Sequence, residues 1–127
     1  MSVPDYLGIA DGARLLRAKQ LSPLEWTRTL VARIEAHDPK LNAFLRFTPE
    51  QALEDARRAE AEIASGAWRG PFHGVPYALK DIVDYAGLPT TAHSRVLQDK
   101  VARADAAVTQ RLRSAGAVFM GKLATHE

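Results

Sequence analysis

One lysine stands out among the residues that could do chemistry. Lys80 ends a short apolar run in the stretch PFHGVPYALKDIVDYAGLPTTAHS, and Asp81 follows it directly. Neighbouring side chains of a strand point to opposite faces, so these two residues are not expected to form a simple ion pair. In an open α/β sheet, sites form at the carboxyl ends of strands, where a lysine that loses its hydration becomes a base near neutral pH. The pattern alone nevertheless favours an ordinary solvated lysine, because most lysines are exposed.

The other candidate residues carry weaker signals. The chain has four histidines, His37, His73, His93 and His126. They share no metal-ligand spacing, so turn or surface positions are favoured for all four. Two of them, His73 and His93, lie on expected loops near Lys80 and could approach a site there. Ser94 could reach a ligand from the same loop, although a hydroxyl that bonds its own backbone is the favoured interpretation.

Composition excludes several classes of function. The 127 residues are 46% apolar and 25% charged, which is typical of a globular protein. The formal net charge is only +2, and no clustered basic stripe indicates a nucleic-acid surface. The absence of cysteine excludes a disulfide framework, a thiolate nucleophile and a cysteine-ligated metal. Neither a GxSxG nucleophile elbow nor a GxxxxGK[ST] phosphate loop is present.

The start of the chain gives no targeting signal. Residues 1–16 lack a basic segment followed by a long apolar one, so no signal peptide is expected. No apolar run approaches the length of a membrane span. The expected location is the cytoplasm.

Periodic patterns predict three helices in the first half of the chain. The first covers roughly residues 5–18. The second begins with the capping box of SPLEW, with Ser22 as N-cap, and is expected to end near residue 36 because HDPK places a proline there. The third follows Thr48 as N-cap and runs to about residue 64. A short alternating run at residues 41–47 predicts a strand between the second and third helices.

Two buried strands are predicted in the second half of the chain. VPYAL at residues 75–79 predicts a buried strand with Pro76 at its start, and DIVDY after it is expected to extend the same sheet. AVFMG at residues 117–121 predicts another buried strand.

A fourth helix is predicted between these strands, capped by Asp105 and ended by Gly116, with Val108, Leu112 and Ala115 on one face. Two strands joined through a helix imply a parallel pair within a larger sheet. We therefore expect a helical region over residues 1–66 and the first α/β part of a domain over residues 67–127, incomplete in this chain.

Taken in order, the motifs of residues 70–127 resemble the amidase signature family. They are the GVP before the strand, the KD at its end, the GLPTT loop, the acidic-capped helix, the AGAV strand and the GK…E ending. The upstream helices fit the family's helical N-terminal region more loosely. Several motifs in the right order make the resemblance highly specific.

The resemblance implies both a fold and a reaction. The family has an α/β/α layered fold with a mixed sheet, of which this chain would be the N-terminal part. Members hydrolyse carboxamides, or transfer ammonia from them, with a Ser–cis-Ser–Lys triad. The position that matches the catalytic lysine is Lys80, which would act through the bridging serine to take the proton of the nucleophilic serine. The ester formed with the substrate's acyl group would then be resolved by water or another acceptor.

The sequence departs from the family pattern at two places. No GGSS-like stretch occurs in residues 1–127, so both serines are expected beyond Glu127, and this chain alone is expected to be inactive. His93 stands where members commonly have the glycine of T-T-x-G-S. Histidine tolerates left-handed φ better than most residues, so the loop is expected to form, while the substitution leaves its shape and its role toward substrate open.

No cofactor and no metal are expected. The expected partners are a small-molecule carboxamide, the remaining part of the same chain and, for the full-length form, a second copy in a homodimer. Neither a membrane nor a direct nucleic-acid partner is expected. Two alternatives stay open: the amidase-like subunit of a glutamine-dependent tRNA amidotransferase, and a non-enzymatic α/β interaction module.

Overall fold

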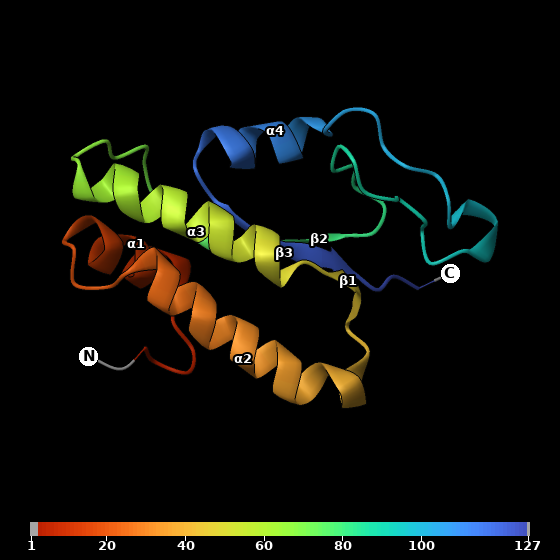
Figure 1. Ribbon diagram of the computed structural model, residues 1–127, viewed down its shortest axis with the longest axis horizontal. Helices are drawn as coiled ribbons and strands as arrows, with labels where there is room; N and C mark the ends of the chain where they lie inside the picture. The colour runs from red at the N-terminus through yellow and green to blue at the C-terminus, as the bar shows by residue number, and fades with distance from the viewer. Residues whose placement is uncertain (1–2, 127) are drawn as a thin grey trace.

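The computed structural model describes residues 3–126, so Glu127 of the GK…E ending lies outside the described residues. The helices are α1 (Ile9–Arg17), α2 (Pro23–Leu41), α3 (Pro49–Ala64) and α4 (Ala107–Ser114), with a 3₁₀ turn η1 (Arg95–Leu97). The strands are β1 (Phe44–Phe47), β2 (Pro76–Lys80) and β3 (Val118–Leu123) (Figure 1). No described helix has both the length and the apolar content to cross a membrane.

The three strands form one mixed sheet in the order β1-β3-β2. β2 and β3 are parallel, and β1 runs antiparallel to β3. The predicted parallel pair and the α/β class are therefore confirmed. The expected larger sheet is represented in residues 3–126 by these three strands.

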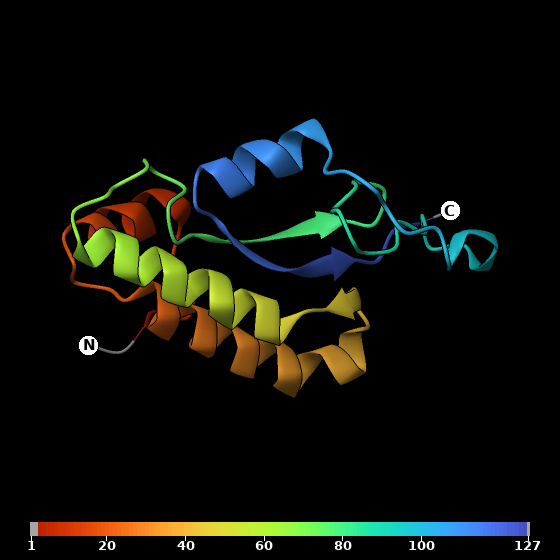
Figure 2. The same cartoon turned by 45° about the horizontal axis from the view of Figure 1, so that its top comes forward.

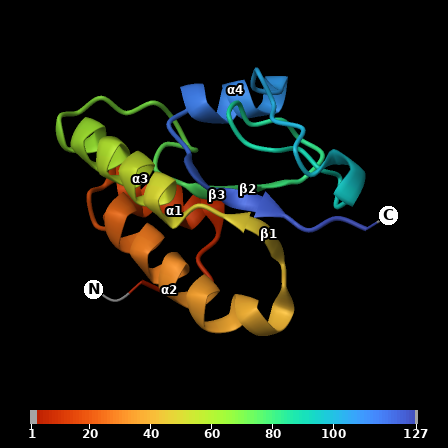
Figure 3. The same cartoon turned by 45° about the vertical axis from the view of Figure 1, so that its right-hand side comes forward.

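Helices cover both faces of the sheet. Figure 2 shows α4 on one side of β2 and β3, with α2 and α3 on the other, and Figure 3 shows the same order of layers. Alternation along β3 explains this arrangement, because Val118 and Met120 pack with the small residues of α3, whereas Phe119 packs with Leu79 and Tyr85 on the α4 side.

The predicted face of α3 is confirmed, since its inward residues are all buried: Ala52, Ala56, Ala59 and Ile63. The start of α2 is also confirmed, because the Glu25 N–H donates to Ser22 Oγ at 3.1 Å. Thr48 precedes α3 as predicted but makes no side-chain cap bond. α1 begins at Ile9, four residues later than expected.

The predicted end of α2 near residue 36 is wrong. The helix continues through Pro39 to Leu41 and ends at Asn42, whose φ of 51° is left-handed. Asp38 keeps the helical conformation despite the proline after it. Its carboxylate accepts hydrogen bonds from Ala43 N at 2.8 Å and Phe44 N at 3.2 Å, which stabilise the exit of the chain from the helix.

Two further predictions in the second half are corrected. DIVDY does not extend the sheet, because β2 ends at Lys80 and the next residues form a turn in which the Ile82 and Val83 N–H groups donate to the Lys80 carbonyl. Asp105 does not cap α4. Its carboxylate instead accepts from Ala86 N at 2.7 Å and pairs with Arg113 at 2.9 Å. These bonds tie the turn after β2 to both ends of α4.

The buried face of α4 is also displaced from the predicted one. Val108 is 48% exposed, whereas Thr109 is fully buried and donates its hydroxyl to the Asp84 carbonyl at 2.7 Å. A threonine that bonds a backbone oxygen can replace an apolar residue on an inward face, which the apolar pattern did not reveal.

Candidate functional site

The carboxyl ends of β2 and β3 lie at the same edge of the sheet. Lys80 is the last residue of β2 and stands opposite Leu123 at the end of β3. The GLPTT loop and the segment after β3 come together at this edge, as the Asp81 N–H donates to the Leu123 carbonyl at 3.0 Å and the Ala92 N–H donates to the Asp81 carbonyl at 2.8 Å. This is where a site is expected in an open α/β sheet.

The Lys80 side chain points out of the sheet edge. It is exposed, and it makes no side-chain hydrogen bond or ion pair within residues 3–126. Asp81 is only 2% exposed, so the two neighbours do point to opposite faces, as the alternation predicts. The amino group of Lys80 is therefore free to meet another group.

Asp81 is instead paired with Lys122, the lysine of the GK motif on β3. The Lys122 Nζ lies 2.8 Å from Asp81 Oδ1, and Lys122 is only 1% exposed. The other carboxylate oxygen of Asp81 accepts from the Thr91 N–H at 3.1 Å and from the Thr91 hydroxyl. Lys122 also points toward the Pro89 carbonyl and the Thr90 hydroxyl, each 3.4 Å from its Nζ.

The electrostatics of Asp81 follow from these contacts. Burial acts to raise the pKa of this carboxyl group, but the hydrogen bonds from Lys122 and Thr91 outweigh it, and the pKa lies below its ordinary value. Asp81 is thus held as a carboxylate that faces inward, away from Lys80.

The loop that carries His93 adopts the conformation that glycine usually provides. Ala92 and His93 both have left-handed φ angles, of 50° and 62°. Two bonds hold His93 there: its backbone N–H donates to the Thr91 hydroxyl at 3.1 Å, and its Nδ1 lies 2.8 Å from the Thr125 carbonyl. A carbonyl only accepts, so Nδ1 carries the proton in this contact.

A pocket of about 600 Å³ opens beside this loop, lined by His93, Ser94, Arg95, Val96 and Thr125. Ser94 Oγ accepts from the Val96 N–H at 3.2 Å, which confirms the interpretation of its hydroxyl as a local backbone partner. The structure therefore brings His93 and Ser94 together at one pocket and ties them to the segment after β3.

The other histidines do not line this pocket. His37 and His126 are exposed. His73 lies before the opposite end of β2 and is fully buried, so a turn position is confirmed for it and a surface position is wrong. Its Nε2 lies 2.7 Å from Glu62 Oε2, and its Nδ1 accepts from the Arg69 N–H at 3.1 Å. Both ring nitrogens are used, which makes His73 a structural residue.

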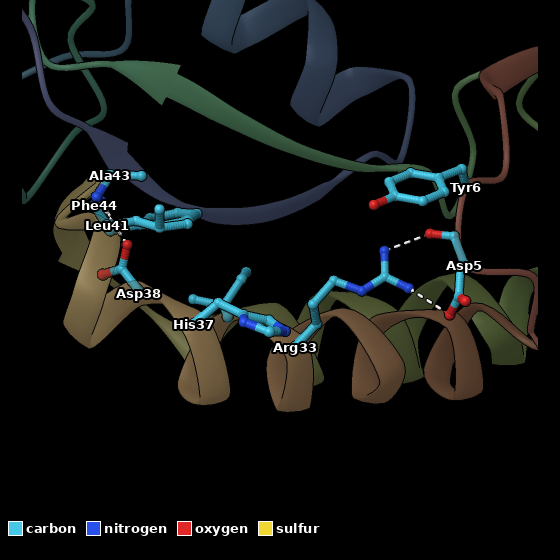
Figure 4. Close-up of a pocket in the computed structure, with 9 residues that line it drawn as sticks. Asp5, Tyr6, Arg33, His37, Asp38, Leu41, Ala43 and Phe44 are labelled. Atoms are coloured by element: carbon cyan, nitrogen blue, oxygen red, sulfur yellow. Dashed lines mark hydrogen bonds and ion pairs between the residues drawn. The ribbon is translucent and has the colours of Figure 1, made fainter.

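A second pocket, of about 550 Å³, lies along α2 (Figure 4). An ion pair of 3.0 Å between Arg33 and Asp5 spans one side of it, and Leu41 and Phe44 form the other end. Neither a lysine nor a serine lines this pocket. The serine–lysine chemistry that the resemblance implies therefore has neither of its residue types in this pocket.

Sequence reasoning missed Lys122 as a residue of the site. Its signal was present, because a lysine within the apolar strand VFMGKL must be desolvated and therefore needs a partner of opposite charge. The acidic residue at the end of the parallel neighbouring strand, Asp81, was the available one.

Comparisons with known proteins agree with this geometry. A family model described as Amidase matches residues 25–127. The glutamyl-tRNA(Gln) amidotransferase A-subunit of Moorella thermoacetica is 47% identical over 93% of this chain and 24% of its own length. An acylamidase of Rhodococcus erythropolis is 36% identical over 96% of this chain and 26% of its own.

Solved structures give the same result. The native peptide amidase of Stenotrophomonas maltophilia superposes with a TM-score of 0.86 at 36% identity, over 94% of this chain and 25% of that one. The chain thus spans about a quarter of the length of the relatives it matches. The family match, the sequence identities and the shared fold together show that the chain belongs to the amidase signature family.

Proposed function

We propose that this chain supplies the lysine base of an amidase that cleaves carboxamide C–N bonds through a serine acyl-enzyme. The observation that carries the proposal is the contrast at the end of β2. Asp81 is buried and paired with Lys122, whereas Lys80 is exposed at the sheet edge without a partner in residues 3–126. A segment that packs against this edge and carries a hydroxyl group would desolvate Lys80, which favours the neutral amine and lets it accept the proton of that hydroxyl.

The chemical steps follow from the need to activate a weak nucleophile. The neutral amine of Lys80 takes the proton of the nucleophilic serine through the bridging serine, and the serine oxygen attacks the substrate carbonyl. Lys80 returns the proton through the bridging serine to the leaving amine, and water then hydrolyses the acyl-enzyme. Residues 1–127 contain no Gly/Ser-rich stretch of the family type, so the two serines come from outside these residues.

Lys80→Ala in the complete enzyme tests the proposal. We expect kcat for a simple carboxamide to fall by about 10²–10⁴-fold, the usual worth of a general base, with little change in thermal stability because Lys80 makes no side-chain hydrogen bond or ion pair within residues 3–126. Lys40→Ala is the matched control, since Lys40 is an exposed lysine in the last turn of α2. Turnover of Lys80→Ala at the rate of the Lys40→Ala control would remove Lys80 from the mechanism.

A second candidate is the amidotransferase reaction. The 47% identity to a glutamyl-tRNA(Gln) amidotransferase A-subunit favours it. In that case the complete protein would release ammonia from glutamine only with its partner subunits and an acylated tRNA present. Hydrolysis of simple carboxamides by the isolated protein, without co-purified subunits, would favour the first candidate.

A further inference from the structure

Three segments of the site edge meet at one buried charge pair. Asp81 follows Lys80 at the end of β2, Thr91 belongs to the GLPTT loop, and Lys122 belongs to the GK motif of β3. Asp81 bonds to both Thr91 and Lys122 through its side chain. Its backbone is bonded as well, to Leu123 and Ala92. One residue therefore connects the end of β2, the end of β3 and the loop.

The pair is costly to bury, which indicates a requirement for it. Lys122 and Asp81 are 1% and 2% exposed, and desolvated charges are retained only when they are well paired. Within residues 3–126, Lys122 is the only cationic side chain that contacts the Asp81 carboxylate. Without Lys122, the nearest cation along the chain would be Lys80, the adjacent residue.

We infer that Lys122 is a positioning residue for Lys80: by binding the Asp81 carboxylate, it fixes the end of β2 and leaves the Lys80 amine uncommitted. This inference rests on the proposed role of Lys80 as the base. It adds that Lys122 of the GK motif positions Lys80 of the KD motif without contacting the substrate.

Other charged groups around this edge are already engaged or lie outward. His93 in the loop bonds the Thr125 carbonyl through Nδ1. Asp105 and Arg113 already form an ion pair, with 2.9 Å between Arg113 Nε and Asp105 Oδ2. Asp84, in the turn after β2, is exposed. Lys122 is thus the group whose removal would leave a buried carboxylate uncompensated next to Lys80.

The test compares Lys122→Met with the paired neutral variant Asp81→Asn/Lys122→Gln in the complete enzyme. In Lys122→Met the unneutralised carboxylate would hold a proton on the Lys80 amine to higher pH. We expect the acidic limb of the kcat/KM profile to move to higher pH, and kcat at pH 7 to fall about 100-fold with KM nearly unchanged. The paired variant removes both charges and keeps polar side chains at both positions, so its acidic limb should return to that of the unmodified enzyme.

Each outcome bears on the inference. If Lys122→Met only lowers stability, and its folded form keeps the unmodified pH profile and kcat, the inference is wrong. If Lys122→Met does not fold, the pH profile of the paired variant is the test. A displaced acidic limb in that neutral enzyme would overturn the inference, because the variant has no unpaired carboxylate that could displace it. Lys80→Ala separates the proposed function from this inference. If Lys80→Ala loses activity but Lys122→Met keeps the unmodified pH profile, the proposed function stands and only the role of Lys122 is removed.

Discussion

Strand alternation separates the two adjacent charges Lys80 and Asp81. The same alternation sends Asp81 inward to Lys122 and Lys80 outward to the sheet edge. The sequence predicted this separation from the strand pattern alone. It did not predict the partner of Asp81, because the contact joins residues 41 positions apart and depends on the register of β2 against β3.

The lowered pKa of Asp81 predicts how stability depends on acidity. A carboxyl group whose pKa is lower in the folded state binds fewer protons there than when unfolded, so its contribution is complete above the ordinary pKa and is lost as the pH falls. Asp81→Asn should therefore flatten the fall in unfolding free energy between about pH 5 and pH 2. Urea titrations over a pH series measure this slope.

Asp99→Asn is a suitable control for this prediction, since Asp99 is an exposed carboxylate in the same loop region. An unmodified slope in Asp81→Asn would show that the buried pair does not govern acid stability. Asp81→Asn is also expected to lower stability at neutral pH, because it leaves Lys122 buried without its counter-charge.

At the scale of elements, runs and repeats of one residue type predicted helices and strands most reliably. The small-residue face of α3 and the apolar strands β2 and β3 were predicted because each consists of a local run or repeat of buried residues. The end of α2 and the cap of α4 were mispredicted because Asp38 and Asp105 bond to residues of other segments. The proposed division of the chain at residue 66 stays a prediction.

Gly121 gives an element-scale prediction about the sheet. Its φ is 145°, and a Cβ at this position would collide with the Arg46 carbonyl of β1. Because a backbone atom cannot move aside as a side chain can, Gly121→Ala should separate β1 from β3 and cost about 1–3 kcal/mol or more of unfolding free energy. Chemical denaturation measures the change.

Gly66→Ala is the matched comparison. Gly66 also has a positive φ, of 87°, but a Cβ there would meet nothing within 4 Å. Only the backbone strain of about 1–2 kcal/mol is then expected. Equal losses in the two variants would mean that the contact with Arg46 does not limit the position.

At the scale of the whole molecule, the chain forms a layered α/β unit whose sheet ends at β1 and β2 in the described residues. Large apolar side chains are exposed on several elements, among them Leu41, Ile82 and Val96. The sequence predicted the family from its ordered motifs. The sequence did not predict the substrate, because no motif in residues 1–127 indicates which acyl group or which leaving amine is bound.

The isolated chain 1–127 is expected to be inactive and to self-associate in solution. It lacks the serine motif, and unpaired strand edges with exposed apolar residues favour association. We expect no hydrolysis of a simple carboxamide, binding of the dye ANS, and elution above monomer size in size-exclusion chromatography. A monodisperse chain that does not bind ANS would instead support a self-sufficient interaction module, and measurable hydrolysis would refute the missing nucleophile.

Chemical rescue of Lys80→Ala tests the central claim, that Lys80 is the base, most directly. Methylamine added to the complete Lys80→Ala enzyme should raise the rate of carboxamide hydrolysis in proportion to the concentration of the neutral amine, because the shortened side chain leaves room for a soluble base. Tetramethylammonium carries a positive charge but cannot accept a proton, so it should have no effect. Equal acceleration by both compounds, or full activity of Lys80→Ala without either, would contradict the account.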